Sequence, residues 1–175
     1  SANSFDDLYN ALQNPFTYLD EILIKILDAR LKEVNPKLVC LSVPFPGNLY
    51  TSLRCAQWIK QHYPGTKVAM GGGFANTELR SLSDVRVFEF YDFITLDDGE
   101  APLEILIEHL DGKKKQHELK RCFTLVNGVV TYINNTNCSD YKQGQVGTPD
   151  YDGLFLDKYI SAIEVINPMH SLWSD

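Results

Sequence analysis

Hydrophobic residues repeat along the chain with two periods, which predicts alternating helices and strands. Over residues 19–34 apolar positions recur every three or four residues, as on one face of an amphipathic helix, with Asp20 on the polar side. We expect this helix to begin at Asn14-Pro15, an N-cap followed by proline, and to end at Asn35-Pro36. Its inward-facing residues are then Leu19, Ile22, Leu23, Ile26, Leu27, Leu31 and Val34.

Three continuous apolar runs have the length and composition of buried parallel strands. They span residues 38–43, 67–71 and 92–96, and the first shows no polar alternation, as expected when both faces of a sheet are covered. Each run ends in a loop with Gly or Pro that leads toward a helix. Further along, Asn127-Gly128 suits a type I′ turn, so residues 121–133 are predicted to form a hairpin that extends the sheet.

The helix predicted after the first strand has a buried side and a polar side. It starts near Asn48, and its polar residues Arg54, Lys60 and Gln61 are expected to face water. Cys40 in the strand and Cys55 in the helix fit the pattern of free, buried thiols. The residues expected to be buried are Leu49, Leu53, Ala56, Ile59 and Tyr63.

These elements predict a three-layer α/β domain, Rossmann-like (flavodoxin-like), with a parallel sheet, right-handed crossovers and a C-terminal hairpin. We place the domain at residues 1–133 and interpret the polar, irregular residues 134–175 as a linker or arm. A doubly wound sheet normally begins with a strand, whereas this chain begins with helices, so we expect its first strand to be missing. The outer edge of strand 38–43 would then need cover from residues 134–175 or from a neighbouring molecule.

Composition narrows the function classes. The chain has 175 residues, 44% of them apolar, and a net charge of −7. With no basic cluster beyond Lys113-Lys114-Lys115, nucleic acid and anionic membranes are disfavoured as partners. There is no apolar run of membrane-spanning length, no signal peptide and no CxxC pair, so we expect a cytoplasmic protein without a disulfide framework or zinc site.

The three strand ends are the candidate binding site. Residues Gly71–Gly73 follow the second strand, and residues without a Cβ let a ligand or phosphate approach the backbone closely. The loop 44–47 follows the first strand and the loop 96–100 follows the third. One such junction taken alone is more typical of an ordinary turn, but because parallel strands place three of them side by side, we expect a binding crevice there.

The candidate chemistry lies mainly in the carboxylates Asp97, Asp98 and Glu100. They could accept hydrogen bonds from ribose or amide groups, bind a metal, or complement the N-terminus of a helix predicted from Pro102; these roles are compatible. The four histidines lack metal-ligand spacing, and no Ser-His-Asp or Cys-His set can be assembled, so we assign no catalytic or metal-binding residue. The motifs GxGxxG and GxxxxGK[ST] are absent.

The order Ser-Val-Pro-Phe-Pro-Gly, Gly-Gly-Gly-Phe and Leu-Asp-Asp-Gly-Glu resembles the cobalamin-binding domain of radical SAM enzymes. The segments 35–42 (Asn-Pro-Lys-Leu-Val-Cys-Leu-Ser) and 148–154 (Thr-Pro-Asp-Tyr-Asp-Gly-Leu) are similar to the same family. The resemblance implies that three loops cradle the nucleotide tail of cobalamin. Carried over, the cofactor-binding residues are Ser42, Val43, Pro44, Phe45, Pro46, Gly47, Gly71, Gly72, Gly73, Phe74, Leu96, Asp97, Asp98, Gly99 and Glu100.

The resemblance also implies what the rest of the full-length protein does. In the family a following barrel carries a CxxxCxxC motif whose 4Fe–4S cluster cleaves S-adenosylmethionine for methyl transfer or other radical chemistry. This chain contains no such motif, so we expect no turnover from it alone. The DxHxxG motif is also absent, which implies no protein histidine on cobalt, and a missing first strand would leave cobalamin binding weak.

Two alternatives remain open from the sequence. One is a non-catalytic α/β binding module that has lost the cofactor. The other is a nucleotide-dependent transferase that uses residues 71–73 to hold phosphate.

Overall fold

A five-stranded mixed sheet lies at the centre of the fold, and the computed structural model describes residues 4–154. The strands are β1 (Leu38–Ser42), β2 (Lys67–Gly71), β3 (Phe93–Thr95), β4 (Cys122–Val126) and β5 (Val129–Ile133), in that spatial order. β1, β2 and β3 are parallel, while β4 is antiparallel to both β3 and β5. The predicted parallel strands and the hairpin are therefore confirmed, and the fold is Rossmann-like α/β.

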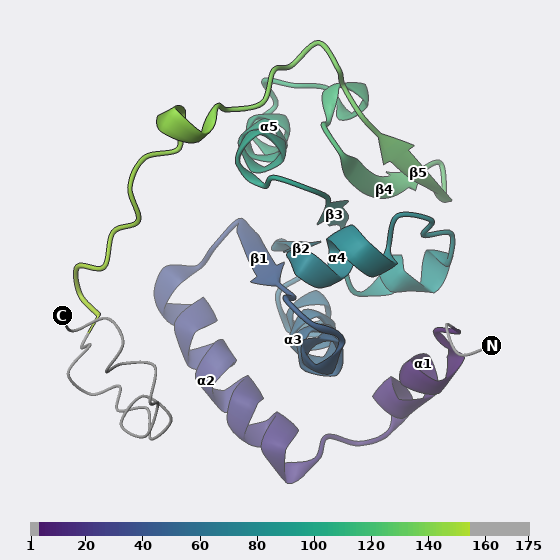
Figure 1. Ribbon diagram of the computed structural model, residues 1–175. Coiled ribbons are helices and arrows are strands. Elements are labelled where there is room, and N and C mark those ends of the chain that lie inside the picture. The colour runs from purple at the N-terminus through teal and green to yellow at the C-terminus, as the bar shows by residue number, and fades with distance from the viewer. Residues whose placement is uncertain (1–3, 155–175) are drawn as a thin grey trace, which may run out of the picture. The chain divides into compact units, whose positions relative to one another are not determined.

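The helices form layers on both faces of this sheet (Figure 1). They are α1 (Asp6–Gln13), α2 (Tyr18–Val34), α3 (Leu49–His62), α4 (Gly73–Glu78) and α5 (Glu100–Leu110). Short 3-10 turns span Pro46–Asn48, Val85–Glu89, Gln116–Glu118 and Gln143–Gln145. No helix in the described part of the chain is long and apolar enough to cross a membrane.

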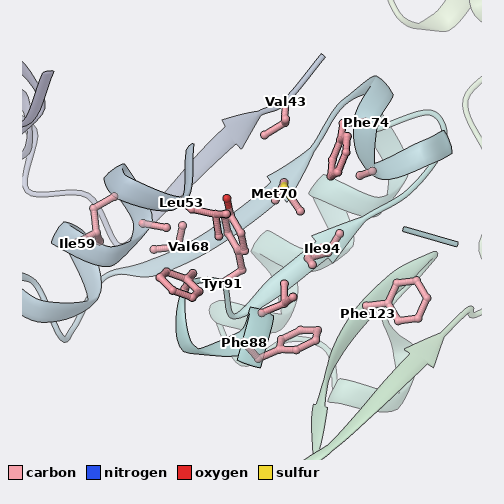
Figure 2. Close-up of a cluster of buried hydrophobic side chains, with 14 of the residues drawn as sticks. Val43, Leu53, Ile59, Val68, Met70, Phe74, Phe88, Tyr91, Ile94 and Phe123 are labelled. Carbon is pink, nitrogen blue, oxygen red and sulfur yellow. The ribbon is translucent and has the colours of Figure 1, made fainter. Parts of the chain in front are cut away.

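Alternating residues of the strands point to opposite faces of the sheet and belong to two hydrophobic clusters. Val68, Met70 and Ile94 point to the α3 side and pack with Leu53, as Figure 2 shows. On the opposite face Ala69, Phe93 and Cys122 pack against Ile105 and Leu106 of α5. The aromatic residues near the start of β3, Phe88, Phe90 and Tyr91, are buried in the first cluster.

Helix α2 is rotated relative to the prediction. Leu19, Ile22 and Ile26 are exposed, whereas Asp20 is only 5% exposed. The cause is a capping box: Asp20 accepts hydrogen bonds from Thr17 and from the hydroxyl of Tyr50, which fixes its carboxylate inside. The helix therefore begins after Thr17 and not at Asn14-Pro15; its predicted end at Asn35 is confirmed.

Arg54 corrects a second expectation, because its side chain is 1% exposed and does not face water. Its guanidinium donates to the carbonyl oxygens of Ala11, Leu12 and Asn14 at 2.8–3.1 Å. The remaining N–H groups meet Tyr50 and Gln57. A buried guanidinium needs such partners, and here the last carbonyls of α1 supply most of them.

β1 is an edge strand with one face open. Val39 and Leu41 pack toward α3, but Cys40 is exposed on the other face, which corrects the expectation of a buried thiol and a fully covered strand. Bonds from Lys67 N to Lys37 O and from Val43 N to Gly71 O show that odd-numbered residues pair with β2. The amides of the even-numbered residues therefore point to an edge that no described strand covers.

The chain divides into two compact units, Ser1–Tyr141 and Lys142–Asp175. Within the second, the described residues form a 3-10 turn and a turn in which Leu154 N donates to Tyr151 O. The predicted linker from residue 134 and the cover of the β1 edge stay predictions. The part of the predicted arm beyond Leu154 lies outside the described residues.

Candidate functional site

The loops after β1, β2 and β3 lie side by side, because the parallel register aligns the strand ends. Ser42 pairs with Gly71 in the ladder, and Met70 pairs with Ile94. Next to them, the hydroxyl of Thr95 lies 3.1 Å from the position that a Cβ on Gly71 would take. The carboxyl ends of three strands thus meet at one place, as the sequence predicted.

A cavity of about 360 Å³ opens at this place, on the face of β1 that α5 leaves uncovered. Its volume is within the range of roughly 300–1,000 Å³ typical of small-molecule sites. Apolar side chains line most of it, and hydroxyl and carboxyl groups stand among them. The lining residues are Cys40, Leu41, Ser42, Ala69, Met70, Gly71, Gly72, Thr95, Asp97, Gly99, Glu100 and Leu103.

Gly72 and Gly73 have a packing reason to be glycines. Gly72 has φ +100°, and a Cβ there would lie 2.7 Å from the carbonyl oxygen of Val43. A Cβ on Gly73 would lie 2.8 Å from the carbonyl oxygen of Pro44. Hydrogen bonds from Val43 N to Gly71 O and from Phe74 N to Val43 O join the two loops. The space that a side chain on either glycine would need is therefore occupied by the backbone of the neighbouring loop.

The predicted cofactor-binding residues fall into three groups. Six line the cavity: Ser42, Gly71, Gly72, Asp97, Gly99 and Glu100. Three lie in the hydrophobic core, where their side chains are shielded: Val43, Phe74 and Leu96. The others lie on exposed loop or helix-end positions outside the cavity lining: Pro44, Phe45, Pro46, Gly47, Gly73 and Asp98.

The loop after β3 is held by cations. Asp97 has φ +62°, and its carboxylate pairs with Arg80 and lies 3.9 Å from Nε of Arg121. Its backbone N–H donates to the side-chain oxygen of Asn76 at 2.7 Å. Glu100 lies in the first turn of α5, where its charge complements the helix N-terminus. Of the roles considered from the sequence, the helix-terminus role thus suits Glu100, and Asp97 is engaged with arginines.

The part of the chain that the structure describes was also compared with what a metal site needs. Within it, no group of three or more His, Cys, Asp or Glu side chains could hold a metal ion. His62 stacks on Trp58, and the ring of His109 bonds the carbonyl oxygen of Lys114. The cavity offers apolar contact, and hydrogen-bonding groups from Ser42, Thr95 and Glu100 at the loops.

Sequence reasoning missed several residues of this site. Cys40, Ala69 and Thr95 could have been found, because side chains two positions apart on a strand share a face with the loop residues that follow. Leu103 could have been found from its position one turn into α5. Arg121, which precedes β4, carried no local signal, because only the fold brings it to the loop 96–100.

Comparison with known proteins gives one similar solved structure. No family model matches the chain, and no curated protein matches it. A structure described as that of an apo, selenomethionine-labelled cobalamin-dependent S-adenosylmethionine radical enzyme, OxsB, is similar with a TM-score of 0.49 and 23% sequence identity. The match covers 67% of this chain but only 16% of that much longer chain.

Proposed function

We propose that the chain binds cobalamin by its nucleotide tail, as the cofactor-binding part of a radical SAM enzyme. The observation that carries this proposal is the cavity of about 360 Å³ between the three loops. Six residues that the sequence motifs assign to the cofactor line it, although they come from three separate segments. Cobalamin would supply the cobalt-centred chemistry, and S-adenosylmethionine and the 4Fe–4S cluster would belong to another domain of the same protein.

The residues present fit the tail of this cofactor. Cys40 and Ala69 on the sheet and Leu103 of α5 give an apolar surface suited to a flat heteroaromatic base, which gains most from leaving water. The hydroxyls of Ser42 and Thr95 also line the cavity and would supply hydrogen-bond partners for ribose oxygens. The fit concerns the tail alone, because the cavity lining contains no histidine that could meet the cobalt.

The nucleotide-dependent transferase is less well supported. Phosphate binding at residues 71–73 needs backbone N–H groups that a phosphate can approach closely. The glycine faces are filled by the backbone of Val43 and Pro44. Asp97 and Glu100 at the cavity would repel a nucleoside di- or triphosphate, although Arg80 and Arg121 offset the charge of Asp97.

Cys40 provides a direct test, because it is an exposed thiol in the cavity lining. Burial raises the pKa of the Cys122 thiol to about 12 and raises the pKa of the Cys55 thiol, so both should stay unreactive. In a C138S variant, maleimide labelling should therefore report Cys40 alone. Partial burial raises the pKa of Cys40 as well, so labelling is best run at about pH 8.5.

We expect cyanocobalamin to slow the labelling of Cys40 about threefold at twice its Kd, since only free protein is then labelled. Cobinamide, which lacks the nucleotide tail, should protect much less at the same concentration, and ATP should not protect. Protection by ATP alone would favour the transferase. No protection by cyanocobalamin, either in this chain or after a strand-forming segment is added before it, would favour the module without cofactor.

A further inference from the structure

Two residues near the cavity have a positive φ outside any helix cap or hydrogen-bonded turn. Among residues 4–154, four residues other than glycine have positive φ. Asn35 is the left-handed cap of α2 and Asn127 lies in the hairpin turn, both common places for asparagine. Asp97, with φ +62°, and Arg121, with φ +43°, have no such role. They lie against each other, with 3.9 Å between Oδ2 and Nε.

Arg121 forms hydrogen bonds with several backbone groups at the start of the loop after β3. Its carbonyl oxygen accepts a hydrogen bond from Leu96 N at 2.9 Å. Its guanidinium donates to Leu96 O at 3.4 Å and to Asp98 O at 3.0 Å. The side chain is only 13% exposed, so these contacts are shielded from water. One residue thus bonds Leu96 and Asp98, on either side of Asp97, in a loop that forms a wall of the cavity.

The other side of the guanidinium is held by Asp140. The two side chains form a bidentate pair with distances of 2.8 and 2.7 Å. Lys120 lies 3.5 Å from the same carboxylate and donates to Cys138 O, which holds the chain after the hairpin in place. Because the bidentate pair fixes the plane of the guanidinium, it also fixes the direction of the N–H groups that reach the loop.

The loop is held from the α4 side as well. Arg80 pairs with the carboxylate of Asp97, and Asn76 accepts the N–H of Asp97. A positive φ at a residue other than glycine costs roughly 1–3 kcal/mol and persists only where the surroundings over-determine it. Here contacts from both sides oppose the relaxation of Asp97, and Arg121 supplies the most buried of them.

We propose that Arg121 is a positioning residue for the candidate pocket. It holds the loop 96–100 in the conformation in which Asp97, Gly99 and Glu100 line the cavity, and Asp140 is its anchor. The nature of the ligand rests on the proposed function. The ordering of the loop does not, which allows the two to be tested separately.

The test is Arg121→Gln, which keeps a polar side chain but loses the charge and the fork of donors. Amide hydrogen exchange of Leu96 and Asp97 should become at least about tenfold faster, because the loop opens locally. Protection of Cys40 by cyanocobalamin should then require about tenfold more ligand. Arg121→Lys should give exchange rates and ligand requirements between those of the parent and of R121Q. Its ammonium can pair with Asp140 but cannot reach both carbonyl oxygens.

Arg86→Gln is the matched control. Arg86 also forms ion pairs with two carboxylates, Asp84 and Asp6, and none of the three lines the cavity. Its loss should leave the exchange of the loop and the protection of Cys40 unchanged. If R86Q accelerates exchange in the loop as much as R121Q does, the effect is general destabilisation and the proposal is wrong.

A second variant separates positioning from mere stability. Glycine adopts φ +62° without strain, so adding Asp97→Gly to R121Q should restore much of the slow exchange at Leu96. Unchanged exchange at Leu96 and Asp97 in R121Q would overturn the role of Arg121. If no corrinoid protects Cys40, either in the parent chain or after a strand-forming segment is added before it, the proposed function fails, and the exchange experiment still decides the role of Arg121.

Discussion

At position 72 two loops cross so closely that only glycine fits. We predict that Gly72→Ala lowers the free energy of unfolding by about 3 kcal/mol, because the new Cβ would meet the backbone of Val43 and φ is +100°. Gly47→Ala is the control: nothing lies within 4 Å of its Cβ position, so its effect should be within about 1 kcal/mol. Urea denaturation measures both; equal midpoints would contradict the packing account of Gly72.

The ionisation of Asp92 should make the stability of the protein depend on pH. Burial alone would raise the pKa of its carboxyl, but hydrogen bonds from Val68 N, Lys60 and Lys67 outweigh burial and lower the pKa below the ordinary value of 3.8. The stability from these bonds is present above pH 3.8 and is lost as pH falls through the lower, folded-state pKa.

Asp92→Asn should therefore destabilise the protein at neutral pH, and the difference from the parent should shrink as pH falls below about 4. Thermal melts between about pH 2 and 7 measure this. Asp111→Asn, at the exposed end of α5, should show a much smaller difference. A difference that stays constant over the whole range would exclude the proposed role of the Asp92 charge.

Single residues were predictable where their local sequence decides their role, and not where a distant segment does. Asn35 as the end of α2 and Asn127-Gly128 as a turn were read correctly, because these roles follow from backbone preference alone. Arg54 was placed in water because arginine usually is. Arg54 is 42 residues from Leu12 in sequence. Only the folded chain brings it next to α1, whose carbonyl oxygens reverse that preference.

At the scale of elements, hydrogen exchange should show β1 as an open edge. We predict that the amides of Leu38, Cys40 and Ser42 exchange much faster than those of Val39 and Leu41, which pair with β2. Slow exchange at all five would mean that another chain segment or a second molecule covers the edge. The concentration dependence of the exchange would separate these two explanations.

The positions of strands were predictable, but the orientation of α2 was not. Continuous apolar runs bounded by Gly and Pro mark buried strands, and their parallel pairing follows from the helices between them. Helix α2 has apolar residues on more than one side. Asp20 determines which side is buried. Its carboxylate accepts a hydrogen bond from Tyr50 and lies 3.7 Å from Arg54. A polar residue thus overrides the hydrophobic pattern.

At the scale of the whole molecule, the candidate site was predictable in location and only partly in composition. A parallel sheet brings the ends of its strands together whatever their side chains, so three glycine- and proline-bearing loops sufficed to locate the crevice. The open face around Cys40 depends on how far α5 extends over the sheet, which no local pattern records.

The contacts of Arg54 determine where the protein can be shortened. Its guanidinium takes three carbonyl oxygens from the end of α1, and a helix of eight residues has little stability of its own. A version trimmed to start at α2 would keep a cation at the centre of the molecule without most of its acceptors. We therefore expect removal of residues 6–14 to destabilise the fold, because these residues supply three of the acceptors of a buried arginine.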